Sequence, residues 1–192
     1  PTDTQFVDLC IDDQGFINAI DYTRGRVFQY DETGELMFVF GGMGKQTGLF
    51  QKPAAIESVG DRLYVLDADK RCITVFAPNR LALKTREAIA LYNQGLYEEA
   101  LVPWQDVLRT DSGNTFAYAS MGKAYLEAGD YRQAMENFRL GQDRDGYSRA
   151  FKEYRTQMIR QYFPFIGIGF VLLLVLLFLY LKRRQLAPIL AK

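Results

Sequence analysis

The sequence predicts a multidomain chain with an all-β front part, an all-α middle part and one transmembrane α-helix near its end. Three observations support this prediction. The phrase DYTRGRVFQY at 21–30 returns as DADKRCITVF at 67–76, after 46 residues. Gly, Tyr, Ala and a large aromatic residue recur at an offset of 34 residues between 95 and 138. Finally, residues 163–181 carry no charged side chain.

Residues 1–80 are predicted to form antiparallel β-sheet. Their apolar runs are short, rich in Val, Ile, Phe and Tyr, and separated by D-x-x-G and G-D turns. We expect strands in the segments QFVDLCI, FINAID, RVFQYD, ELMFVFG, AAIESV, RLYVLD and CITVF. The last three segments repeat the first three. A repeat of roughly 45 residues that holds four strands is typical of a β-propeller blade.

The alignment of the two copies places Asp67 at the position of Asp21. A carboxylate between the second and third strands accepts backbone N–H groups of the turn, while a nearby cation, Arg24 or Lys70, offsets its charge. We prefer this structural role to a catalytic one.

These segments resemble NHL-type β-propellers, whose phrase runs Asp, two residues, Asn, one residue, Arg, then Ile or Val. The positions that match the phrase are Asp21, Arg26, Val27, Asp67 and Ile73. The positions that depart from it are Arg24, Lys70 and Cys72. The resemblance implies that 1–80 are the last one to two blades of an incomplete NHL-like propeller, with further blades upstream of Pro1.

Residues 81–148 are predicted to form two helical hairpins. The segments GLYEEALVPW and GDYRQAMENF are separated by 34 residues, which is the tetratricopeptide period. Small Ala residues let antiparallel helices approach, and the aromatic residues fill the space between hairpins. The resemblance to tetratricopeptide (TPR) proteins implies a concave groove that binds a protein or peptide. Candidate groove residues, each also explicable as a solvated surface residue, are Asn93, Asn114, Lys123 and Arg139.

Residues 149–162 are predicted to form a capping or juxtamembrane helix, with a dedicated partner helix as the alternative. Apolar residues return on one side every three or four positions. The basic residues before the apolar run are Arg149, Lys152, Arg155 and Arg160. They contact either anionic lipid headgroups or water.

Residues 163–181 are predicted to cross a membrane. A helix of that length is about 28 Å long, close to the thickness of the hydrocarbon core. Lys182, Arg183 and Arg184 follow at once and favour a cytoplasmic C-terminus, although the four upstream cations nearly balance them. We therefore expect the front part to be extracellular and 182–192 to be a cytoplasmic tail or the start of a loop.

The order of these parts resembles a group of bacterial membrane proteins, mostly Gram-positive, in which an NHL propeller and TPR units continue into a Yip-type membrane domain. The resemblance implies a location at the cell membrane beside a sugar transporter. It also implies that the chain is an internal fragment, with QLAPILAK leading into further sequence.

Composition argues against an enzyme. The chain of 192 residues has 23 basic and 23 acidic side chains, so no net charge attracts nucleic acid. It has no His, which removes the usual general base and the commonest zinc ligand. We expect no catalytic residue, cofactor or metal site. Cys10 and Cys72 are read as small core side chains, with a disulfide or a reactive thiol as alternatives.

The function predicted from these features is that of a membrane-anchored interaction or scaffold protein, which docks a protein or glycan-related partner at the cell surface. The alternative is a metal-dependent lactonase- or lyase-like enzyme with its active site in a propeller channel, for which the visible acids are Asp8, Asp21 and Asp67. An assembly factor for a membrane complex differs from the first prediction only in its partner.

Overall fold

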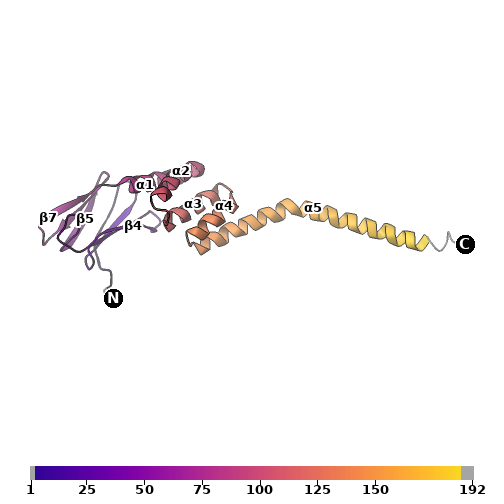
Figure 1. The fold of residues 1–192 in the computed structure, drawn as a ribbon, viewed down its shortest axis with the longest axis horizontal. Helices are drawn as coiled ribbons and strands as arrows, with labels where there is room; N and C mark the ends of the chain where they lie inside the picture. Colours follow the sequence, from indigo (N-terminus) through magenta and orange to yellow (C-terminus); the bar gives the residue numbers. More distant parts are fainter. Residues whose placement is uncertain (1–2, 187–192) are drawn as a thin grey trace.

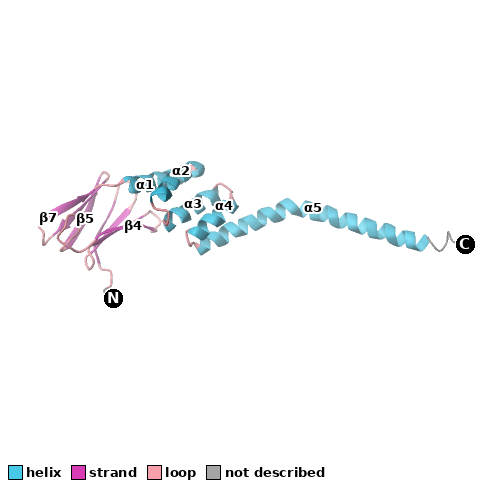
Figure 2. Ribbon diagram, viewed as in Figure 1, coloured by secondary structure: helices cyan, strands magenta, loops and turns pink. Residues whose placement is uncertain are grey.

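Strands occupy the first part of the chain and helices the second. The computed structural model describes residues 3–186. The strands are β1 (Phe6–Ile11), β2 (Ile17–Asp21), β3 (Arg26–Tyr30), β4 (Leu36–Gly41), β5 (Pro53–Val59), β6 (Arg62–Asp67) and β7 (Cys72–Phe76). The helices are α1 (Arg80–Asn93), α2 (Tyr97–Thr110), α3 (Thr115–Glu127), α4 (Tyr131–Leu140) and α5 (Arg144–Leu186). The molecule is elongated, with the sheets at one end and α5 projecting from the other (Figures 1 and 2).

The strands form two antiparallel sheets in which neighbours along the chain are neighbours in space. The first sheet has the order β1-β2-β3-β4, and the second has the order β5-β6-β7. All seven predicted strand segments are strands. The alternating apolar pattern and the short turns are therefore sufficient to locate the strands.

One apolar core joins the two sheets. Its buried members are Cys10, Ile20, Val27, Phe50, Ile56, Leu63 and Val65. The Phe76 ring lies 5.1 Å from that of Phe40 and 5.9 Å from that of Phe50, at the edge of this core. A polar contact also ties β1 to β5, because the Ile56 N–H donates to the Asp8 carboxylate at 2.9 Å. The two sheets are consequently packed as layers of one body.

Each sheet also has an apolar outer face. Leu9, Ala19, Phe28 and Val39 lie opposite one another across the first sheet. Leu9 is 59 % exposed, whereas the next residue, Cys10, lies in the core. In the second sheet Ile73 and Val75 are exposed in the same way. Since successive side chains of a strand alternate between faces, both sheets present apolar residues on both sides.

The repeated aspartates have the predicted structural role. Asp21 and Asp67 are fully buried at the ends of β2 and β6. The Asp67 carboxylate accepts backbone N–H groups of Gln51 and Lys52, as well as those of Asp69 and Lys70, at 2.7–3.2 Å. Burial alone would raise the pKa of Asp67, but these N–H donors outweigh it and lower the pKa below its ordinary value.

The Lys70 cation has a different role from the one predicted. Its ammonium group donates to the carbonyl groups of Gln46 at 3.0 Å and Leu49 at 2.7 Å. It therefore fixes the loop between the two sheets and has no ion pair with Asp67 among the described residues. Backbone N–H groups alone satisfy the buried Asp67 carboxylate.

Helices α1–α4 pack in antiparallel succession. Asn79, Asn114 and Asp130 cap α1, α3 and α4 through side-chain oxygens that accept backbone N–H groups. Two of the four residue pairs related by the 34-residue offset are buried, namely Ala100 and Ala134, and Trp104 and Phe138. A Cβ at Gly122 would lie 2.7 Å from the Phe138 ring, so only glycine lets this ring pack against α3.

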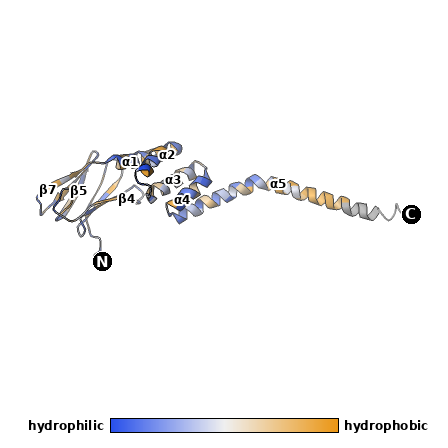
Figure 3. Ribbon diagram, in the orientation of Figure 1, coloured by the Kyte–Doolittle hydropathy of each residue, from blue (hydrophilic) through white to orange (hydrophobic). Residues whose placement is uncertain are grey.

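Helix α5 continues without interruption from its packing against α4 into the apolar run. Between 163 and 179, which we call the apolar segment, every side chain is exposed, and Figure 3 shows this part in orange. The helix is long and apolar enough to cross a membrane. It bends part-way along (Figure 1), and its one proline, Pro164, removes a helical hydrogen bond. The predicted tail beyond 186 lies outside the described residues.

The predicted fold class is wrong. The described residues form a mixed α and β fold of two small antiparallel sheets and five helices, and not a multidomain assembly of propeller blades with separate TPR hairpins. The repeat in the sequence indicates how many strands there are and where the turns lie. Any antiparallel meander has these features, whether or not it belongs to a propeller. How sheets and helices assemble depends on contacts between distant residues. Here the two sheets share one core, and α1 is bound to the first sheet.

Candidate functional site

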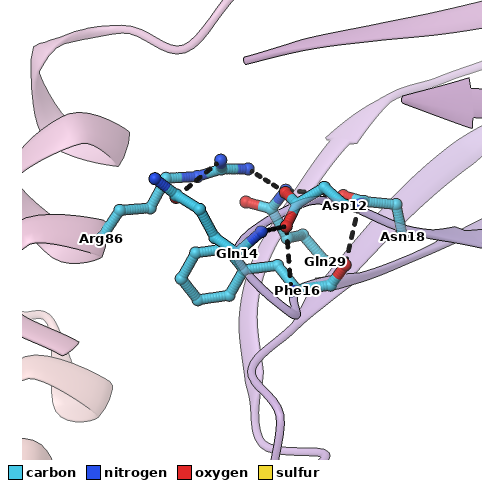
Figure 4. Close-up of polar contacts among 6 residues, drawn as sticks. All are labelled: Asp12, Gln14, Phe16, Asn18, Gln29 and Arg86. Atoms are coloured by element: carbon cyan, nitrogen blue, oxygen red, sulfur yellow. Dashed lines mark hydrogen bonds and ion pairs between the residues drawn. The ribbon is translucent and has the colours of Figure 1, made fainter. Parts of the chain in front are cut away.

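The main polar site lies where α1 meets the first sheet (Figure 4). Arg86 of α1 donates to the Asp12 carboxylate at 2.8 Å and to Gln14 at 3.1 Å. Its guanidinium lies 4.7 Å above the centre of the Phe16 ring. The side chain of Arg86 is 10 % exposed and that of Asp12 is 3 % exposed. We call these four residues the junction, because they hold the helices to the sheets.

The turn before β2 prepares Asp12 for this contact. One carboxylate oxygen accepts the backbone N–H groups of Gln14 and Phe16, both at 3.0 Å, and leaves the other oxygen for Arg86. Behind the turn, Asn18 donates to the Phe16 carbonyl and accepts from Gln29. The ion pair is therefore held on a buried polar network. Among the buried side-chain nitrogen and oxygen atoms of the described residues, only Arg86 Nε has no hydrogen-bond partner.

A cavity of about 360 Å³ opens beside the junction. Its lining combines aromatic and aliphatic side chains of β4, β6, β7 and the start of α1 with a few polar groups. The polar lining residues are Gln29, Asp61, Asn79 and Arg86. This size and composition suit the binding of an apolar group.

The acid of the junction is fully engaged by contacts within the chain. One oxygen of the Asp12 carboxylate accepts two backbone N–H groups and the other accepts from Arg86, so both oxygens have partners. Residues 3–186 contain no group of three or more acids or cysteines placed to hold a metal ion. The visible acids of the enzyme alternative, Asp8, Asp21 and Asp67, all accept backbone N–H groups.

Two predicted groove residues lie together on the helices, but they contact the chain itself. Asn93 donates to Glu32 at 2.8 Å, and Lys123 donates to Glu35 at 2.8 Å. Both residues line a small cavity of about 60 Å³ between the helices and the turn that joins β3 to β4. This part of the helical surface is therefore occupied by the turn at 31–35.

The other two predicted groove residues lie elsewhere. Asn114 accepts from the Ala117 N–H at 2.8 Å and thus caps α3. Arg139 pairs with Glu136 on the surface of α4 and borders an open hollow of about 620 Å³ near the start of α5. The structure does not bring these two residues to Asn93 and Lys123, so no single groove unites the four.

Sequence reasoning missed the junction. Asp12 and Arg86 are 74 residues apart, and D-D-Q-G at 12–15 is one of the predicted D-x-x-G turns, a pattern that predicts a turn alone. No local pattern marks Arg86, because it lies on a helix with other charged residues. A buried arginine becomes visible only when the packing of α1 on the sheet is known.

The two cysteines differ. Cys10 is buried, as predicted, and burial, with a further contribution from Glu57, raises the pKa of its thiol to about 11. It is consequently an unreactive core side chain at neutral pH. Cys72 is exposed on β7, so the prediction of a core position is wrong for it. Both are free thiols, and no disulfide joins them.

Comparison with known proteins gives no family for the chain. No protein-family model matches it, and no curated protein matches it either. The resemblance to NHL, TPR and Yip-type proteins therefore stays a prediction.

Proposed function

We propose that the chain is a membrane-anchored interaction protein whose folded part, β1–β7 with α1–α4, docks a partner protein at a membrane surface. The observation that carries the proposal is the apolar segment of α5. Its side chains are exposed on all sides of the helix. Phe163 at its start is 69 % exposed, and Leu179 at its end is 54 % exposed. Such a surface is unstable in water and stable in hydrocarbon.

The proposed orientation puts the folded part outside the cell and the C-terminus in the cytoplasm. Support comes from Lys182, Arg183 and Arg184, which follow the apolar residues without an intervening acid. The four upstream cations are spread over 149–160, and one acidic residue, Glu153, lies among them. Protease added to intact cells should then cleave the folded part while the tail stays protected.

The proposed partner is a protein. The folded part presents apolar side chains on its outer sheet faces and a cavity beside the junction, and patches of this kind mark protein contact sites. A partner beside a sugar transporter is the finer prediction, drawn from the resemblance alone. Anchoring helps such docking because it raises the local concentration of both proteins in the plane of the membrane.

Membrane extraction tests the proposal. Vesicles that carry the full chain are washed with alkaline carbonate, which strips peripheral proteins but leaves membrane-spanning ones. We expect the chain to stay in the pellet and to be released by detergent. Release of the intact chain by carbonate would overturn the proposal. Co-purification from detergent then identifies the partner, with a variant lacking the folded part as the control for non-specific capture.

A further inference from the structure

Four basic residues lie on α5 between 149 and 160, before the apolar segment. Arg149, Lys152, Arg155 and Arg160 are all exposed. None of them forms an ion pair with an acid of the described chain, whereas six other pairs are present. Between 146 and 179 the sequence holds one acid, Glu153. We call these four residues the basic band; within residues 3–179 no ion pair neutralises its charge.

The basic band lies at graded distances from the apolar segment. An α-helix rises about 1.5 Å per residue, so Arg160 is roughly 4.5 Å along the axis from Phe163, and Arg155 is roughly 12 Å from it. Lys152 and Arg149 are farther away, at roughly 16.5 and 21 Å. Each headgroup region of a bilayer is about 5–7 Å thick. Arg160 thus lies at headgroup depth, and Arg155 lies just above it.

Screening limits which members of the band interact with lipid. The Debye length is about 8 Å at physiological ionic strength. Arg160 and Arg155 fall within this distance of the headgroups, while Arg149 falls beyond it. Long cationic side chains near the end of a membrane helix also extend towards the headgroups. The interaction should therefore weaken stepwise from Arg160 to Arg149.

We propose that the basic band binds the headgroups of anionic phospholipids in the leaflet nearest the folded part, chiefly through Arg160 and Arg155. This inference rests on the proposed function, since the band meets lipid only if the apolar segment spans a bilayer. Charge complementarity and the position next to that segment select lipid as the occupant. The interaction recruits acidic lipids around α5.

The test compares acidic and neutral lipid next to the chain. The full chain is reconstituted in phosphatidylcholine vesicles that contain a minor fraction of phosphatidylglycerol. Electron spin resonance of spin-labelled lipids then gives the preference of the chain for phosphatidylglycerol over phosphatidylcholine. The cations at 182–184 are replaced by Gln throughout, so that they do not contribute from the other leaflet.

We expect the chain to prefer phosphatidylglycerol over phosphatidylcholine. Arg160→Gln should lower this preference by up to about fivefold, which is the effect of removing one cation at the membrane surface. Arg155→Gln should lower it less, and Arg149→Gln should leave it nearly unchanged. Raising salt to about 1 M, where the Debye length is about 3 Å, should abolish it. The matched control is Arg132→Gln on α4, an exposed arginine far from the apolar segment.

Equal preference in Arg160→Gln and Arg132→Gln would overturn the inference. Such a result would mean that the basic band contacts an acidic protein or water instead of lipid headgroups. A chain that carbonate releases from the same vesicles would overturn the proposed function itself. Since extraction is measured separately from lipid preference, the two failures are distinguished.

Discussion

The folded part and the apolar segment both expose apolar side chains, but they do so in different ways. In the sheets, exposure is one-sided: Val75 on the outer face is 46 % exposed, while Val65 on the inner face is fully buried. In the apolar segment no side faces a protein core, and the exposed residues surround the helix. The first region keeps its structure through its own core, whereas the second has no core and is long and apolar enough to cross a membrane.

This difference separates two kinds of binding surface. A one-sided apolar face is covered by a single partner of matching shape, which is how protein contacts form. An apolar surface around a whole helix is covered by many small molecules, as in a bilayer. The two regions should therefore respond independently to mutation, and the following predictions test that independence.

The largest effect is expected from charges in the apolar segment. The double variant Leu173→Arg and Leu176→Arg places two cations near its middle, where each costs about 2.5–3.5 kcal/mol. We expect carbonate washing to release this variant, while its folded part keeps the unfolding midpoint of the wild type in detergent. Sedimentation after the wash and urea denaturation followed by Trp104 fluorescence measure the two effects.

The matched control puts the same charges on the other apolar surface. Leu9→Arg and Ile11→Arg change two exposed residues of β1. This variant should stay in the pellet as fully as the wild type. If it were released as well, the sheets would take part in membrane anchoring and the distinction between the two regions would be wrong.

A large loss of stability is expected when Asp67 is removed. Asp67→Ala leaves four backbone N–H groups without their acceptor in a buried turn. We expect the unfolding free energy of the folded part to fall by about 3–5 kcal/mol, with no change in membrane retention. Exposed Asp69→Ala, in the same turn, is the control and should change stability by no more than about 0.5 kcal/mol.

The same carboxylate predicts a pH dependence. Because folding lowers the pKa of Asp67 below its ordinary value of 3.8, the charged form is favoured in the folded state. Its contribution is complete above the unfolded pKa and is lost as the pH falls through the folded pKa. The difference in unfolding free energy between wild type and Asp67→Asn should be constant above about pH 5 and shrink below about pH 4. A difference that grew on acidification would contradict this assignment.

A smaller effect is expected at the junction. Arg86→Met keeps the packing on Phe16 but leaves the buried Asp12 without its cation. We expect a loss of about 2–3 kcal/mol, which is less than for most buried pairs because two backbone N–H groups still bind Asp12. Hydrogen exchange should show weaker protection of α1. Arg109→Met, in a pair whose arginine is 76 % exposed, should cost less than about 0.5 kcal/mol.

What the sequence predicts correctly is local. The strands follow from alternating apolar residues, and the role of Asp67 follows from the turn in which it lies. The burial of Ala100 and Ala134 follows from their shared place in a repeated helical pattern. Each of these features depends on residues close together in the chain, where side-chain type and spacing decide the outcome.

What the sequence does not predict depends on distant contacts. The hydrogen bond from Ile56 to Asp8 between the two sheets, the pairing of Arg86 with Asp12 and the contact of Lys123 with Glu35 join residues more than 40 positions apart. A repeat period carries no information about these contacts, so the fold class inferred from it was wrong. The contacts of Asn93 and Lys123 with the turn at 31–35 were not visible in the sequence for the same reason.

The smallest effect is expected on the outer sheet face, and an isosteric substitution measures it. Val65→Thr and Val75→Thr make the same chemical change on adjacent strands, one at a fully buried site and one at a half-exposed site. Val65→Thr buries a hydroxyl group and should cost about 1–3 kcal/mol, whereas Val75→Thr should cost less than about 0.5 kcal/mol. Val75→Thr should also reduce binding of an apolar dye and of the partner protein. A hydroxyl group in contact with water carries no desolvation penalty. Equal losses of unfolding free energy at both sites would therefore mean that the outer face is shielded from water.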